Sequence, residues 1–143
     1  MTDVHAETRS VVIERDFLFP PERLWRALTQ PHLMAAWLMK TDFAPEIGHR
    51  FQLHGEWGGV LDGEVLEIEP LKRLSYTWDH AHEDPAFALK SVVTFTLTPT
   101  GGGVRLRVEQ AGFRPGQKQA LGGALHGWTR MLAKLEEVAG QAD

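Results

Sequence analysis

The sequence predicts an α+β domain in which a curved antiparallel sheet wraps around one long helix. Strand-like segments with alternating apolar side chains follow one another through short turns from residue 50 to 110. Two short helical segments, which begin near Pro21 and Pro31, separate the first strand from this run. A long amphipathic stretch closes the chain. Helices that gather on one face of an antiparallel sheet define the α+β class.

Length and composition narrow the class of protein. The 143 residues suit a single domain, which we expect over residues 10–143 after a flexible tail at residues 1–9. The absence of cysteine removes disulfides and thiolate metal sites. The net charge of -4 and the lack of a basic block argue against a nucleic-acid partner. Neither a membrane span nor a signal peptide is visible, so we expect a cytoplasmic protein without a membrane partner.

The domain opens with one strand and two short helices. Ser10–Phe19 is rich in β-branched and aromatic residues, which predicts the first strand. Pro21 suits the first turn of a helix because its fixed φ is already helical. A second proline starts another short helix over Pro31–Leu38, with Trp37 on its apolar side.

Five strands follow, at Arg50–Trp57, Val60–Glu69, Arg73–Asp79, Ser91–Thr98 and Val104–Gln110. Short turns link most of them, and the glycines at residues 101–103 form the last hairpin turn. In the second of these strands Val65 conflicts in parity with Leu66 and Ile68, so its facing is ambiguous. If the Val65 face pointed outward, Glu64 would point into a cavity and could act as an acid or base.

The closing helix is predicted over residues 117–139. Its apolar stripe consists of Leu121, Ala124, Leu125, Trp128, Met131, Leu132, Leu135 and Ala139. The first half also contains Gly122, Gly123 and Gly127, each of which costs a helix about 1 kcal/mol relative to alanine. Two interpretations stay open: a loose gate over a cavity, or a surface where a second copy approaches closely and forms a homodimer.

Four segments occur in order along residues 10–139: FPPERLWRALTQPHLMAAWL, IGHRFQLHGEWGGVLDGEVLEIEPLKRLSYTWD, SVVTFTLTPTGGGVRLRVEQAGF and LHGWTRMLAKLEE. Together they resemble the START-like SRPBCC superfamily, in its branch related to activators of the heat-shock-protein-90 ATPase. The resemblance implies a helix-grip fold with an apolar ligand cavity. One departure is Val104 after Gly103, where this branch often has Gly-Thr-Arg-Leu. The family has no common catalytic motif, so the resemblance transfers no active-site residues.

A ligand site is therefore expected between the sheet and the closing helix. We predict that it is lined by Trp37, Phe51, Leu53, Trp57, Tyr76, Trp78, Phe95, Leu121, Leu125, Trp128 and Leu132. Ligand sites are concave and mostly apolar, and a curved sheet closed by a helix tends to leave such a space. The alternative is that these residues form an ordinary core, which sequence alone does not distinguish.

The evidence for polar metal-binding or catalytic residues is weaker. The loop motif His80-x-His82-Glu83-Asp84 could bind zinc, but no fourth-ligand pattern accompanies it, so we expect neither a metal nor a cofactor. His126 lies off the apolar stripe of the closing helix. No phosphate-binding loop and no hydrolase elbow occur, and no residue is predicted to be catalytic.

Three functions fit these observations. Binding of a small hydrophobic molecule fits best, without indicating which molecule. A cyclase-like or hydratase-like enzyme acting on an aromatic or polyketide-like ligand would need a titratable group inside the cavity, such as His126 or Glu64. The resemblance also permits a chaperone-activator role and a chaperone contact, although this chain would stand without the additional N-terminal domain of such activators.

Overall fold

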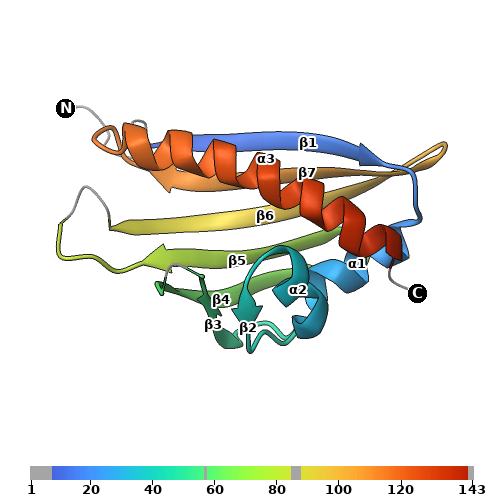
Figure 1. The fold of residues 1–143 in the computed structure, drawn as a ribbon, viewed down its shortest axis with the longest axis horizontal. Coiled ribbons are helices and arrows are strands. Elements are labelled where there is room, and N and C mark those ends of the chain that lie inside the picture. The colour runs from blue at the N-terminus through green and yellow to red at the C-terminus, as the bar shows by residue number, and fades with distance from the viewer. Residues whose placement is uncertain (1–7, 57, 85–87, 142–143) are drawn as a thin grey trace.

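The computed structural model describes residues 8–56, 58–84 and 88–141. Its elements are β1 (Arg9–Phe17), α1 (Pro21–Thr29), α2 (Pro31–Trp37), β2 (Lys40–Thr41), β3 (Arg50–His54), β4 (Val60–Glu69), β5 (Arg73–His80), β6 (Leu89–Thr100), β7 (Gly103–Phe113) and α3 (Lys118–Gln141). This order confirms the predicted α+β class, with two short helices after the first strand and one long helix at the end (Figure 1). None of the helices in these ranges is long and apolar enough to span a membrane.

The strands form one antiparallel sheet in the order β1-β7-β6-β5-β4-β3-β2. From β2 to β7 each strand pairs with its neighbour in sequence, which confirms the predicted meander. The first strand instead pairs with β7 over its whole length. The three helices lie on one face of the sheet, and α3 crosses that face (Figure 1). The arrangement is a helix grip, as the resemblance implied.

The core fills the space between the helices and the inner face of the sheet. From α3 it receives Trp128, near the middle of the helix, and Leu132, Leu135 and Ala139 in its second half. The first half is less buried, because Leu121 and Ala124 are half-buried and Leu125 is 49% exposed. The predicted apolar stripe therefore contacts the core mainly through its C-terminal part.

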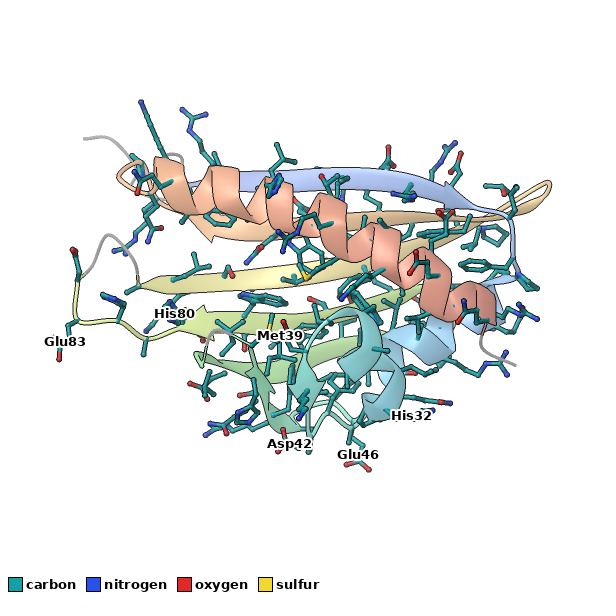
Figure 2. The ribbon with its side chains drawn as sticks, viewed as in Figure 1. His32, Met39, Asp42, Glu46, His80 and Glu83 are labelled. Carbon is teal, nitrogen blue, oxygen red and sulfur yellow. The ribbon has the colours of Figure 1, made fainter. Side chains whose placement is uncertain are left out.

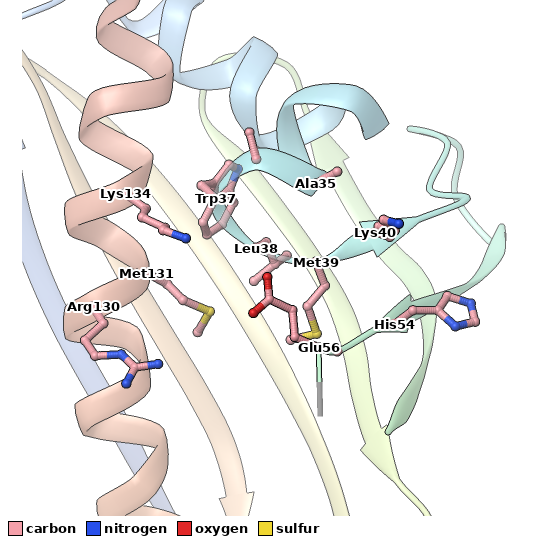
Figure 3. A pocket seen from close by; sticks show the side chains of 12 residues that line it. Ala35, Trp37, Leu38, Met39, Lys40, His54, Glu56, Arg130, Met131 and Lys134 are labelled. Carbon is pink, nitrogen blue, oxygen red and sulfur yellow. The ribbon is translucent and has the colours of Figure 1, made fainter. Parts of the chain in front are cut away.

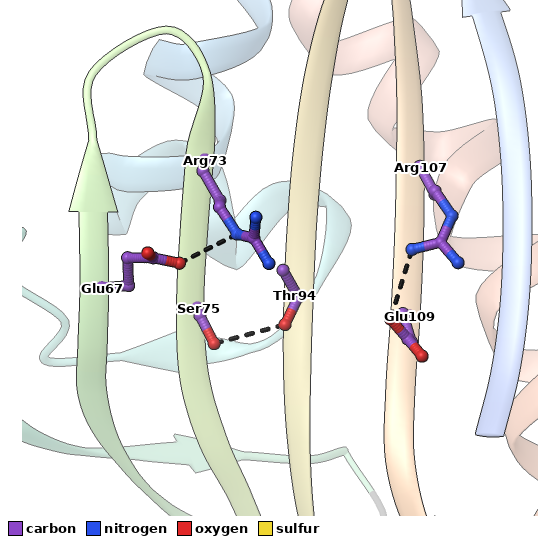
Figure 4. Close-up of polar contacts among 6 residues, drawn as sticks. All are labelled: Glu67, Arg73, Ser75, Thr94, Arg107 and Glu109. Atoms are coloured by element: carbon purple, nitrogen blue, oxygen red, sulfur yellow. Dashed lines mark hydrogen bonds and ion pairs between the residues drawn. The ribbon is translucent and has the colours of Figure 1, made fainter. Parts of the chain in front are cut away.

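The outer face of the sheet carries polar side chains. Arg73 pairs with Glu67 at 2.8 Å, and the hydroxyl oxygens of Ser75 and Thr94 lie 3.3 Å apart (Figure 4). Exposed ion pairs of this kind contribute about 0–1 kcal/mol, so they mark the solvated face more than they stabilise it.

A β-bulge in β4 explains the ambiguous facing of this strand. Val65 pairs with Tyr76, whereas Glu67 pairs with Ser75, so Leu66 is an extra residue in the ladder. Val65 is buried and Leu66 is 43% exposed. The parity conflict in the sequence is therefore the signature of one inserted residue, which shifts the apolar positions that follow it by one.

Some bounds differ from the prediction. The strand predicted over Arg50–Trp57 ends at His54, because the chain turns there and the Gly58 N–H donates to the Gly55 carbonyl oxygen (3.0 Å). The strand β2 has only two residues, which is too short for an alternating pattern, so the sequence does not predict it. The strands β5, β6 and β7 each extend beyond their predicted bounds, because ladder pairing continues there.

Candidate ligand-binding groove

A groove of about 860 Å³ opens between α3 and the segment formed by α2, β2 and the end of β3 (Figure 3). It is lined by Ala35, Ala36, Trp37, Leu38, Met39, Lys40, His54, Gly55, Glu56, Arg130, Met131 and Lys134. Most of these residues are apolar, and the charged ones are Lys40, Glu56, Arg130 and Lys134. The groove therefore offers apolar contact area together with a few polar groups, as small-molecule sites do.

The first wall follows from the way α2 ends. The N–H groups of Leu38 and Met39 both donate to the Met34 carbonyl oxygen, at 2.7 and 3.1 Å, which closes the last turn. The chain then leaves the helix and enters β2, so Leu38, Met39 and Lys40 follow one another along the groove. Trp37 is fixed at the base of this wall, because its indole Nε1 donates to the Ala27 carbonyl oxygen of α1 (2.8 Å).

The second wall is the middle of α3. Arg130 and Lys134 are four residues apart, so they lie one turn apart on the same face of the helix, about 5–6 Å between their Cβ atoms. Met131 is half-buried between this face and the core. Methionine side chains adapt to irregular shapes, so Met131 and Met39 give the groove apolar surfaces that can follow a ligand.

A buried hydrogen-bond network holds α3 against the sheet. The Trp128 indole Nε1 donates to Gln110 Oε1 (2.8 Å), and Gln110 Nε2 donates to Ser91 Oγ (3.0 Å). The Ser91 hydroxyl in turn donates to the Trp78 carbonyl oxygen (2.7 Å). Satisfied buried networks of this kind fix geometry, because any rearrangement would leave a buried polar group unpaired. The network therefore sets the position of the α3 wall.

Sequence reasoning did not single out Gln110. The signal that could have identified it is strand parity, because Gln110 continues the inward series of Val104, Leu106 and Val108 on β7. A polar residue at an inward position needs a partner. The Trp128 indole N–H of the facing helix is that partner.

The predicted lining residues differ in where the structure places them. Trp37 is among the residues around the groove but is itself buried, and Trp57 lies outside the described residues. The structure buries Phe51, Leu53, Tyr76, Trp78, Phe95, Trp128 and Leu132. Leu121 is half-buried and Leu125 is exposed. Apart from Trp37, these residues are not among those that line the groove, so their contact with a ligand stays a prediction.

The buried aromatic residues contact one another in series. The ring centroids of Tyr76 and Phe95 lie 5.7 Å apart, those of Phe95 and Trp128 5.8 Å, and those of Trp128 and Trp78 5.4 Å. Trp37 joins the series edge-on to Phe95 at 6.5 Å. Aromatic pairs at these separations stabilise a core beyond their buried area. Trp37 thus connects this aromatic cluster to the groove.

The two polar residues considered for the cavity lie elsewhere. Glu64 is on the outer face, where its carboxylate lies 3.5 Å from Arg50 Nε and its backbone N–H donates to Thr77 Oγ1 (2.8 Å). His126 is exposed on α3. The groove is instead lined by Glu56 and His54, which the predicted strand Arg50–Trp57 assigns to the solvent face. Glu56 lies in the turn after β3 and its carboxylate points toward α3, whereas the ring of His54, the last residue of β3, points away from α3 (Figure 3).

The loop motif after β5 shows no metal geometry. His82 Nδ1 accepts the Asp84 backbone N–H (2.9 Å), and residues 81–84 are exposed. Figure 2 shows His80 and Glu83 at the end of the molecule away from Met39 and the groove. Within residues 8–56, 58–84 and 88–141, no three His, Cys, Asp or Glu side chains are placed to hold a metal ion.

Comparison with solved structures places this geometry among known folds. Protein MLL2253 from Mesorhizobium loti is 61% identical, with a TM-score of 0.92 over 94% of this chain and 99% of that chain. CalU16 from Micromonospora echinospora is 25% identical, with a TM-score of 0.77 over 94% of this chain and 78% of its own. DynU16, from the dynemicin biosynthetic locus, is 22% identical with a TM-score of 0.79, and the chain spans 47% of its length.

Sequence comparison identifies the family. No curated protein matches the chain. The profile of the activator of Hsp90 ATPase homolog 1-like proteins matches residues 18–140, which extend from the end of β1 almost to the end of α3. The chain therefore belongs to the family of activator of Hsp90 ATPase homolog 1-like proteins.

Proposed function

We propose that this protein binds a small hydrophobic molecule in the groove between α3 and the α2–β2 segment. The observation that carries the proposal is the groove itself, whose volume of about 860 Å³ lies in the range of small-molecule sites. Leu38, Met39 and Met131 supply apolar surface to it, and the buried Trp37 lies behind them. Burial of apolar ligand surface there contributes about 25 cal/mol per Å² before the costs of association.

The rigidity of the two walls supports this proposal. The Trp37 indole is held by α1, and α3 is held by the Trp128–Gln110–Ser91 network, so little backbone ordering has to accompany binding. The same fold occurs in DynU16, which is described as a putative protein in the dynemicin biosynthetic locus. That likeness concerns the fold, and it is compatible with a small-molecule ligand here.

Native mass spectrometry of the protein purified from its own host tests the proposal. We expect a population heavier than the chain by the mass of one small molecule, which solvent extraction removes and which returns on adding the extract. The bare chain mass in every preparation, with no molecule recovered by extraction, would contradict the proposal.

An enzyme acting on the same ligand is the second candidate, because Glu56 and His54 line the groove. A carboxylate and an imidazole are the groups that a cyclase or hydratase would use for proton transfer. The ligand recovered from the host should then be converted by the wild-type protein and left unchanged by a Glu56→Gln variant. Equal conversion by both proteins would remove Glu56 from any such role.

Contact with a chaperone is a third candidate, which rests on the family description. Immobilised protein should then retain a chaperone of the heat-shock-protein-90 class from a lysate of its own host. Loss of that chaperone from the bound fraction in the presence of excess free protein would show specificity. Failure to retain it would contradict this candidate without affecting ligand binding.

A further inference from the structure

The charges around the groove differ from those of the whole chain. The chain has a formal net charge of -4, but the groove is lined by three cations, Lys40, Arg130 and Lys134, and one carboxylate, Glu56. In the described parts of the chain these three cations make no ion pair within 4.0 Å. The ion pairs of the described residues lie mostly on the sheet, such as those of Arg73 and Arg105. Three cations that form no such pair therefore meet at the groove, where they outnumber its one carboxylate.

The cations also stand next to apolar surface. Figure 3 shows the Arg130 and Lys134 side chains extending from α3 into the space between the walls, with Met131 between them and Leu38 and Met39 opposite. Glu56 approaches the same space from the other side without pairing with either cation. A molecule in the groove would meet hydrocarbon on two sides and a pair of cations at one side.

We propose that the groove selects an amphiphile with a single negative charge, an aliphatic or aromatic carboxylic acid, and this inference rests on the proposed function. The Arg130 guanidinium would bind the carboxylate with two parallel N–H bonds, and Lys134 would contribute a second positive charge. The hydrocarbon part lies against Leu38, Met39 and Met131. Glu56 disfavours a second negative charge, so a carboxylate binds better than a phosphate dianion.

A matched pair of probes separates the head group from the tail. The acid 11-(dansylamino)undecanoic acid and its methyl ester share the tail, and only the acid is charged at neutral pH. Their affinities are measured by dansyl fluorescence for the wild-type protein and for an Arg130→Gln, Lys134→Gln variant. The matched control is Lys90→Gln, Lys118→Gln, which removes two exposed cations that do not line the groove.

The wild-type protein should bind the acid about tenfold more tightly than the ester, which corresponds to about 1.4 kcal/mol. The Arg130→Gln, Lys134→Gln variant should lose this preference while its affinity for the ester stays unchanged, and added salt should weaken binding of the acid alone. The control variant should keep the preference. In competition, dodecanoate should displace the acid at lower concentration than dodecyl phosphate does.

The outcomes distinguish the two proposals. Equal affinities for acid and ester, with no effect of the groove variant, would overturn the selectivity and leave hydrophobic binding intact. A preference lost equally in the control variant would overturn the assignment to Arg130 and Lys134. Stronger displacement by dodecyl phosphate would replace the carboxylate with a phosphate head group. Binding of neither probe would contradict the proposed function itself.

Discussion

At the residue scale, Tyr76 reports on the state of the core. It is the only tyrosine of the chain, and its ring contacts Phe43, Phe51 and Phe95 at centroid distances of 5.9, 5.1 and 5.7 Å. Burial raises the pKa of its phenol, because the aromatic surroundings disfavour the phenolate. The folded protein therefore keeps this proton at pH values where an exposed tyrosine would lose it.

Stability should consequently fall at alkaline pH. Above the ordinary tyrosine pKa of about 10 the unfolded chain loses the Tyr76 proton and the folded chain retains it, so the free energy of unfolding decreases by up to about 1.4 kcal/mol per pH unit. Denaturant unfolding across this range should show the decrease, and a Tyr76→Phe variant should lack this component. Tyrosinate absorbance that appears near pH 10 while the circular dichroism stays native would contradict the account.

At the scale of elements, α3 has two unlike halves. The part from Trp128 onward is fixed by Trp128, whose indole N–H donates to Gln110, and by Glu136, which pairs with Arg15 of β1 at 2.9 Å. The part before Trp128 contains Gly122, Gly123, Gly127 and the exposed Leu125. Each half gives a prediction of its own.

For the anchored half, Gln110→Leu should lower the free energy of unfolding by about 1–3 kcal/mol, because the buried Trp128 N–H loses its acceptor. Trp128→Phe in the Gln110→Leu background should then cost less than in the wild type, since no N–H remains to be satisfied. Chemical denaturation of the wild type, the two single variants and the double variant gives this double-mutant cycle. Gln119→Leu on the exposed side of α3 is the control. Additive effects of the two substitutions would contradict the network.

For the glycine-rich half, Gly122→Ala, Gly123→Ala should raise the free energy of unfolding by about 2 kcal/mol. A Cβ atom at either position meets nothing within 4 Å, so the gain in helix propensity is not offset by a clash. If this half gates the site, stopped-flow measurements should also show slower exchange of a bound fluorescent ligand. As a control, Gly140→Ala in the anchored half should leave the exchange rate at its wild-type value. If the double variant also exchanges ligand at the wild-type rate, the interpretation of the glycines as a surface for close approach of a second copy is favoured instead.

At the scale of the whole molecule, the architecture could be predicted and the groove could not. Alternating apolar residues in strands such as β7, and the 3.6-residue stripe that ends in Leu135 and Ala139, reflect local geometry that sequence records directly. The groove depends instead on where the turn after α2 lies relative to α3. An apolar stripe has the same pattern whether it fills a core or lines a cavity, so Tyr76 and Trp37 look alike in sequence.

The polar groove residues escaped prediction for a related reason. Lys40, Arg130 and Lys134 occupy positions that their own helix or strand assigns to solvent, and Glu56 lies in the turn after β3. They come together because α2, β2, the end of β3 and α3 meet at one place. Parity and periodicity describe one element at a time, whereas this arrangement exists only between elements.

The central claim is that the groove binds a small hydrophobic molecule, and titration with the neutral probe N-phenyl-1-naphthylamine tests it most directly. The informative variant is Ala36→Trp, which places a large ring in the groove at an exposed position outside the core, and Ala133→Trp on α3 is its control. The account predicts saturable fluorescence enhancement for the wild type and Ala133→Trp, and at least about tenfold weaker binding to Ala36→Trp. Equal affinity of all three proteins, or no saturable binding to the wild type, would contradict it.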